Sequence, residues 1–144
     1  MRNAQFAMRN RGESFVKDKA AVRRGRWMEM KKHIMKLNPT PMKMFKQGNK
    51  TIELRLYDEK RQKISVGDSI KFVNTQDITD VLNVIVEDLF VFSSFVELYE
   101  NLPLLECGYT PDNIDEASPN DMELYYPKEK QNKYGVVGIK VSVK

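Results

Sequence analysis

The sequence is poor in the residues that build covalent cross-links and common metal centres. It contains one cysteine, Cys107, and one histidine, His33, among 144 residues. A single thiol excludes an internal disulfide, and this pair cannot supply an ordinary Cys/His structural zinc site. We therefore expect neither a metal nor another cofactor, and a free cysteine favours a reducing compartment.

Long apolar segments are also missing. The chain has no run of about 18 apolar residues, and its N-terminus lacks the apolar stretch of a signal peptide. These absences predict a protein with no membrane partner and a cytoplasmic location.

Positive charge is concentrated at one end of the chain. Residues 1–36 contain 11 Lys/Arg and 3 Asp/Glu, whereas the remaining residues contain 13 Lys/Arg and 17 Asp/Glu. A domain that coats nucleic acid needs clustered positive charge on its folded surface. The mildly acidic remainder argues against such a domain, so any recognition of RNA has to be local.

The first 30 residues carry scattered arginines without an apolar period. We interpret residues 1–30 as a basic extension, either a flexible leader or a nucleic-acid-binding arm, and residues 31–144 as one globular domain. With 41% hydrophobic residues, a chain of this length can fill a single core.

Strict alternation over residues 50–57 predicts a strand with one polar face. Isoleucine and leucine alternate there with Thr51, Glu53, Arg55 and Tyr57. A period of two places these four side chains together, about 7 Å apart in succession. A carboxylate, a guanidinium and a phenol therefore share one face of the strand.

The other segments predict a mixed α+β fold. Thr40-Pro41 is typical of a helix start and Gly48 of a helix end. Residues 81–92 predict one bent strand, or two strands separated near Glu87 and Asp88. Further strands are expected at residues 69–72 and 135–143, and further helices after Ser94 and Ser118. We expect a small mixed β-barrel with two or three peripheral helices, whose last strand pairs with an early one.

Three segments together resemble the ASCH family. They are the octet Gly48–Arg55 (GNKTIELR), the turn Val66-Gly67-Asp68 and the stretch Lys133–Ile139. The resemblance covers roughly residues 33–144. It implies a PUA-like barrel that binds RNA or a nucleoside- or nucleotide-like ligand. The family also includes bacterial enzymes that hydrolyse N4-acetylcytidine to cytidine and acetate.

The resemblance also suggests catalytic residues, with one departure. Lys50 matches the family lysine, but Glu53 stands where those enzymes have threonine, and Thr51 matches a different position. The family glutamate falls on Glu106 by spacing. The leading hypothesis is therefore an RNA- or modified-nucleoside-binding domain. The alternative is an amidohydrolase in which Lys50, Glu53 and Glu106 act on N4-acylated cytidine.

Each candidate has a defined chemical role. Lys50 can act as a general acid or base, or as a fixed positive charge. Glu53 can accept a hydrogen bond from the amino group of a nucleobase, and Arg55 can stack on a nucleobase or bind a phosphate group. Tyr126 and Tyr134 can stack bases, or simply pack. Without a ligand, Glu53 and Arg55 would form a surface ion pair contributing about 0.2–1 kcal/mol.

Overall fold

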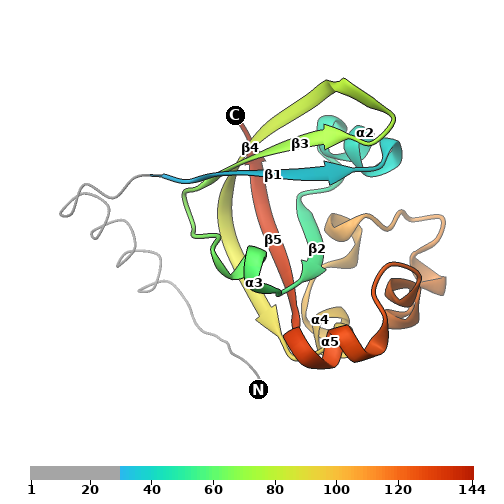
Figure 1. Cartoon of the computed structure of the whole chain (residues 1–144). Coiled ribbons are helices and arrows are strands. Elements are labelled where there is room, and N and C mark those ends of the chain that lie inside the picture. The colour runs from blue at the N-terminus through green and yellow to red at the C-terminus, as the bar shows by residue number, and fades with distance from the viewer. Residues whose placement is uncertain (1–29) are drawn as a thin grey trace.

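Residues 30–144 fold as a mixed α+β structure around one curled sheet (Figure 1). A computed structural model describes residues 30–144, so all of the expected extension except its last residue lies outside the described residues. The strands are β1 (Lys32–Leu37), β2 (Ile52–Leu56), β3 (Ser69–Asn74), β4 (Asp77–Phe92) and β5 (Val136–Val143). The helices are α2 (Pro39–Gln47), α3 (Glu59–Gln62), α4 (Phe95–Asn101) and α5 (Lys128–Tyr134), with 3-10 turns η1 (Leu104–Cys107), η2 (Ile114–Glu116) and η3 (Pro119–Leu124).

The five strands form an open half-barrel in the order β1-β3-β4-β5-β2. β1 pairs with β3 in parallel, and all other neighbours are antiparallel. The last strand, β5, lies between β4 and β2, so the predicted pairing of the C-terminal strand with an early one is confirmed. β1 and β2 are the two edges of the sheet, and the site described below lies where these edges approach.

A bulge lets one long strand serve both halves of the sheet. β4 pairs with β3 through its first part and with β5 through its second part, and its register with β5 shifts between Val86 and Asp88. The extra residue, Glu87, bends the strand. Of the two alternatives for this segment, the single bent strand is confirmed.

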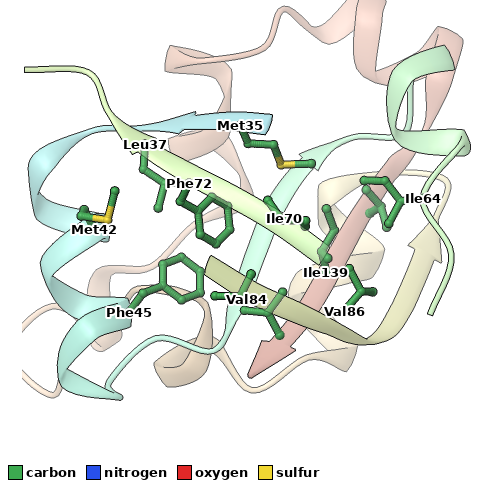
Figure 2. Close-up of a cluster of buried hydrophobic side chains, with 12 residues drawn as sticks. Met35, Leu37, Met42, Phe45, Ile64, Ile70, Phe72, Val84, Val86 and Ile139 are labelled. Carbon is green, nitrogen blue, oxygen red and sulfur yellow. The ribbon is translucent and has the colours of Figure 1, made fainter. Parts of the chain in front are cut away.

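The concave side of the sheet holds the main hydrophobic core (Figure 2). Phe45 of α2 stacks on Phe72 of β3 with ring centroids 5.0 Å apart. Ile139 and Val137 of β5 belong to the same cluster, which we call the half-barrel core. A second cluster, the outer core, lies on the other side of β2, where Ile52 and its neighbours pack against Phe95 and Leu98 of α4.

Helix α2 begins two residues earlier than the sequence pattern predicts. Its first residue is Pro39 and its N-cap is Asn38, so the predicted cap at Thr40 is wrong. Pro39 suits the first helical position as well as Pro41 does, and the Asn38 side chain accepts a hydrogen bond from Thr75 instead of capping the helix. The predicted end is confirmed, because Gly48 closes the helix with φ 81°.

Residues 30–144 contain more helix than expected, with four α-helices in place of two or three. The additional ones, α3 and α5, are short and charged, so they show no apolar period. The predicted cap at Ser94 is present, since the Ser94 hydroxyl accepts a hydrogen bond from the Glu97 backbone amide. Ser118 and Asp121 form a capping box, but the helix that follows is of the 3-10 type.

Candidate ligand-binding site

The polar face of β2 points into the half-barrel. Glu53 pairs with Ile139 and Arg55 with Val137 of β5. Directly opposed residues of antiparallel strands project to the same side of a sheet, and these two partners belong to the half-barrel core. The charged side chains therefore share the concave face with apolar ones, while the leucines of β2 face the outer core.

Three charged side chains converge there, and we call Lys50, Glu53 and Arg55 the charged cluster. Glu53 accepts a hydrogen bond from Arg55 Nε at 2.7 Å through Oε2, and its Oε1 lies 3.4 Å from Lys50 Nζ. Lys50 Nζ also donates to the Cys107 carbonyl at 2.6 Å. Lys50 and Glu53 are only 6% and 7% exposed. The alternative of an exposed surface ion pair therefore does not describe this arrangement.

Arg55 connects the two edge strands. Its Nη2 donates to the Lys36 carbonyl of β1 at 2.6 Å, while its Nε is held by Glu53. Burial disfavours the guanidinium charge and is the largest single influence, but the charge and hydrogen bond of Glu53 together with Tyr126 and Asp58 outweigh it, so the pKa of Arg55 is raised. Arg55 is thus a fixed cation at the opening between β1 and β2.

A cavity of about 510 Å³ adjoins the charged cluster, a size within the usual range of small-molecule sites. It is bounded by the end of β1, the start of α2, the polar residues of β2 and the segment around η3. Four tyrosines from outside the sheet complete its wall: Tyr99, Tyr109, Tyr125 and Tyr126. The cavity therefore combines buried charge with aromatic surface.

The tyrosines differ in their surroundings. Tyr126 stacks on Phe95 with centroids 6.2 Å apart, and burial raises its pKa. Tyr125 is exposed. The Tyr99 and Tyr109 hydroxyl oxygens lie 2.7 Å apart, and the Tyr109 hydroxyl donates to Asp121 Oδ2 at 2.6 Å. The wall thus offers aromatic faces and an ordered hydrogen-bond chain.

The profile of the family described as "ASCH domain" matches residues 35–144. The chain belongs to the ASCH domain family. The curled mixed sheet described above is accordingly the PUA-like fold of this family, as the resemblance implied. A comparison with the curated proteins finds no match.

Solved structures support the same assignment. The crystal structure of hypothetical protein PH0355 is 35% identical, covers 78% of this ASCH chain and 99% of its own, and has a TM-score of 0.66. The solution NMR structure of protein PF0455 from Pyrococcus furiosus is 33% identical, with coverages of 78% and 96% and a TM-score of 0.58. A tyrosine-to-phenylalanine mutant of ZmASCH from Zymomonas mobilis is 14% identical, with coverages of 78% and 69% and a TM-score of 0.56, and shows the fold alone.

Four of the predicted site residues of this ASCH domain line the cavity: Lys50, Glu53, Arg55 and Tyr126. Lys50 precedes the first residue of β2, so the alternation of the strand does not dictate its direction. Its ammonium group is instead held by Cys107 and Glu53.

The other predicted residues do not line it. The Thr51 hydroxyl donates to Glu106 Oε1 at 2.7 Å, and this bond, with Lys140 at 3.4 Å, lowers the pKa of Glu106. Tyr57 packs against the half-barrel core and Tyr134 against the outer core. Thr51 and Glu106 therefore form a separate polar contact outside the cavity.

Sequence reasoning missed Tyr99, Tyr109 and Asp121. For Tyr109 and Asp121 a signal was available, because the long irregular connection between α4 and α5 is itself typical of functional loops; Tyr99 lies within α4 and had no such signal. The capping box at Ser118 also indicated that Asp121 would be held in place.

The loop after η1 fixes one end of the charged cluster. Gly108 has φ 118°, and a Cβ built there would lie 3.3 Å from Lys50 Nζ. Burial raises the pKa of the Cys107 thiol to about 11, so this cysteine is a poor nucleophile at neutral pH. Cys107 thus contributes its carbonyl rather than its sulfur.

The described part of the chain also limits other kinds of site. Among residues 30–144, no group of three or more His, Cys, Asp or Glu side chains is placed to hold a metal ion. Every helix within that range is too short or too polar to cross a bilayer.

Proposed function

We propose that this ASCH domain binds a nucleoside-like ligand, such as an unstacked base of single-stranded RNA, in the cavity between β1 and β2. The convergence of Lys50, Glu53 and Arg55 on a cavity walled by tyrosines carries this proposal. The association of ASCH domains with RNA and nucleotide-like ligands supports it.

The chemistry of the cavity matches the parts of a nucleoside. Lys50 and Arg55 can donate to base carbonyl or phosphate oxygens, and Glu53 retains lone pairs for a donor group. Tyr126 offers an aromatic face of the kind on which unstacked bases are recognised. The site residues we propose are therefore Lys50, Glu53, Arg55 and Tyr126, joined by Tyr99 and Tyr109.

Calorimetric titration with cytidine and with a short single-stranded RNA tests this proposal. Lys50→Ala should weaken binding by about tenfold or more, because a charge-assisted hydrogen bond is lost. Lys128→Ala makes the same chemical change at a side chain 68% exposed on α5 and should leave binding unchanged. Circular dichroism shows that each variant is folded. Equal affinity in folded Lys50→Ala, Arg55→Ala and the parent would refute the proposal.

Hydrolysis of N4-acylated cytidine is the second candidate. It is favoured by the 3.4 Å separation of Lys50 Nζ and Glu53 Oε1 beside a cavity of nucleoside size. In this reaction water adds to the acyl carbonyl, the amide C–N bond breaks, and the exocyclic nitrogen takes a proton to give cytidine and the carboxylate of the acyl group, which is acetate for N4-acetylcytidine. Glu53 and Lys50 would move the protons.

Incubation with N4-acetylcytidine, followed by chromatography, separates the two candidates. Release of cytidine that disappears in Lys50→Ala would establish the amidohydrolase despite Glu53 at the position of the enzyme threonine. Binding of N4-acetylcytidine without release would support the binding function alone. Glu106→Gln should leave either result unchanged, because Glu106 does not line the cavity.

A further inference from the structure

A chain of three hydrogen-bonding groups runs along the cavity wall. Tyr99 comes from α4, Tyr109 follows η1, and Asp121 belongs to η3. All three residues line the cavity. The two hydroxyl oxygens lie 2.7 Å apart, and Tyr109 lies 2.6 Å from Asp121 Oδ2. Both separations are hydrogen-bond distances.

The Asp121 carboxylate determines which group donates in each of these hydrogen bonds. A carboxylate has no proton to donate, so Tyr109 must donate to Asp121. The Ser118 amide donates to the same oxygen, which confirms that Oδ2 acts as an acceptor. Tyr109 has only one proton, and two hydroxyl oxygens at 2.7 Å need a proton between them. The proton of that second bond therefore comes from Tyr99.

Because Tyr99 donates its proton to Tyr109, its hydroxyl oxygen can only accept a hydrogen bond from any other group. Its proton is used toward Tyr109, and within residues 30–144 no group donates a hydrogen bond to its oxygen. Burial raises the pKa of both tyrosines, so both keep their protons at neutral pH. An acceptor that lacks a donor in a half-buried cavity favours a ligand that supplies one.

We propose that Tyr99 is a specificity-determining residue that selects nucleobases bearing an amino group over those bearing a keto group at the same position. A base amino group donates to the Tyr99 oxygen, whereas a keto oxygen would face its lone pairs. Lys50 and Arg55 supply donors for the acceptor atoms of the same base. The proposal rests on the proposed function of the cavity and adds the class of base.

Calorimetric titration with three pyrimidine nucleosides tests the proposal. Cytidine carries the amino group, uridine a keto oxygen, and 2-pyrimidinone riboside neither. The intact chain should bind cytidine about tenfold or more tightly than the other two, as expected for one hydrogen bond in a desolvated site. Tyr99→Phe should reduce this preference to about twofold or less, because the acceptor is gone.

Two further variants show whether the preference for cytidine depends on the direction of the Tyr99–Tyr109 hydrogen bond or on the shape of the cavity. Tyr109→Phe removes the acceptor of the Tyr99 proton, so Tyr99 can then donate, and uridine should gain affinity relative to cytidine. Tyr134→Phe makes the same chemical change outside the cavity and should keep the parent preference. A Tyr109→Phe protein with the full parent preference would overturn the proposal.

Failure of this inference is distinguishable from failure of the proposed function. Equal binding of cytidine and uridine by the intact chain would overturn the role of Tyr99 while leaving the cavity as the ligand site. Absence of binding by all three nucleosides and by single-stranded RNA would refute the proposed function, and the specificity assignment with it.

Discussion

The half-barrel core and the charged cluster occupy the same concave face but differ in polarity, since one is apolar and the other is charged. Glu53 lies directly opposite Ile139, and Arg55 lies opposite Val137. On β5 this face is apolar and buried, whereas on β2 it is charged and borders the cavity. One sheet therefore combines an apolar region that forms the core with a charged region that borders the cavity.

The energetics of buried charge explain the difference. Removing ions from water costs several kcal/mol each, and in buried ion pairs their mutual attraction often does no more than offset this cost. Replacement of such pairs by apolar residues of similar volume is often neutral or stabilising. We infer that the charged cluster is present for a ligand. The variants below test this contrast in decreasing order of expected effect.

Phe72→Ala should have the largest effect on stability. The ring is fully buried and stacks on Phe45. Its removal should lower the free energy of unfolding by about 3–5 kcal/mol, measured by urea denaturation. Ile78→Ala, at a side chain 81% exposed, should change it by less than about 0.5 kcal/mol. Similar losses in both variants would contradict the assignment of the core.

Glu53→Ala breaks the charged cluster instead of replacing it. Lys50 would remain buried and Arg55 partly buried without their anion, which should cost about 3 kcal/mol of unfolding free energy. Glu100→Ala, at an exposed position of α4, serves as the matched control and should change stability by less than about 0.5 kcal/mol. A Glu53→Ala protein as stable as this control would show that the cluster is solvated.

Comparison of Gly108→Ala with Gly48→Ala should separate the effect of backbone strain on stability from the effect of displacing Lys50 on ligand affinity. An alanine at this positive φ should cost about 1–2 kcal/mol, and its Cβ would displace the Lys50 ammonium. Gly48→Ala has the same kind of strain, but nothing lies within 4 Å of its Cβ. Both variants should lose stability in urea titrations, whereas only Gly108→Ala should lose affinity for cytidine. Equal affinities would place Lys50 outside the binding site.

The Cys107 thiol should give the smallest effect. With its pKa raised to about 11 by burial, it should react with iodoacetamide at pH 8 much more slowly than in the unfolded chain. Because it is the only cysteine, mass spectrometry reports this reaction directly. The unfolded chain loses the thiol proton at a lower pH than the folded one, so the free energy of unfolding decreases as pH rises from about 9 through 11. Equal rates in folded and unfolded protein would contradict the burial.

Local patterns were sufficient to predict several parts of this molecule. Alternation along β2 placed Glu53 and Arg55 on one face, the octet from Gly48 to Arg55 indicated the ASCH family, and the segment ending at Phe92 was correctly described as one bent strand or two. These features depend on neighbours in sequence, where a period of two or a helix-ending glycine has a direct structural meaning.

The remaining features depend on contacts between distant segments. Alternation shows which residues share a face but not which face lies inside, so the burial of Glu53 against the half-barrel core could not be predicted. The meeting of Tyr99, Tyr109 and Asp121 requires the irregular segment between α4 and α5 to fold back onto α4. For the same reason, spacing alone could not show that Glu106 contacts Thr51 outside the cavity.

The most direct test of the account replaces the whole charged cluster by apolar residues. The variant Lys50→Met/Glu53→Leu/Arg55→Met should unfold at the same urea concentration as the parent or a higher one, while binding of cytidine is abolished. A loss of about 3 kcal/mol or more in the triple variant would show that the cluster stabilises the fold. Binding of cytidine by the folded triple variant with the parent affinity would contradict the assignment of the cluster to the ligand.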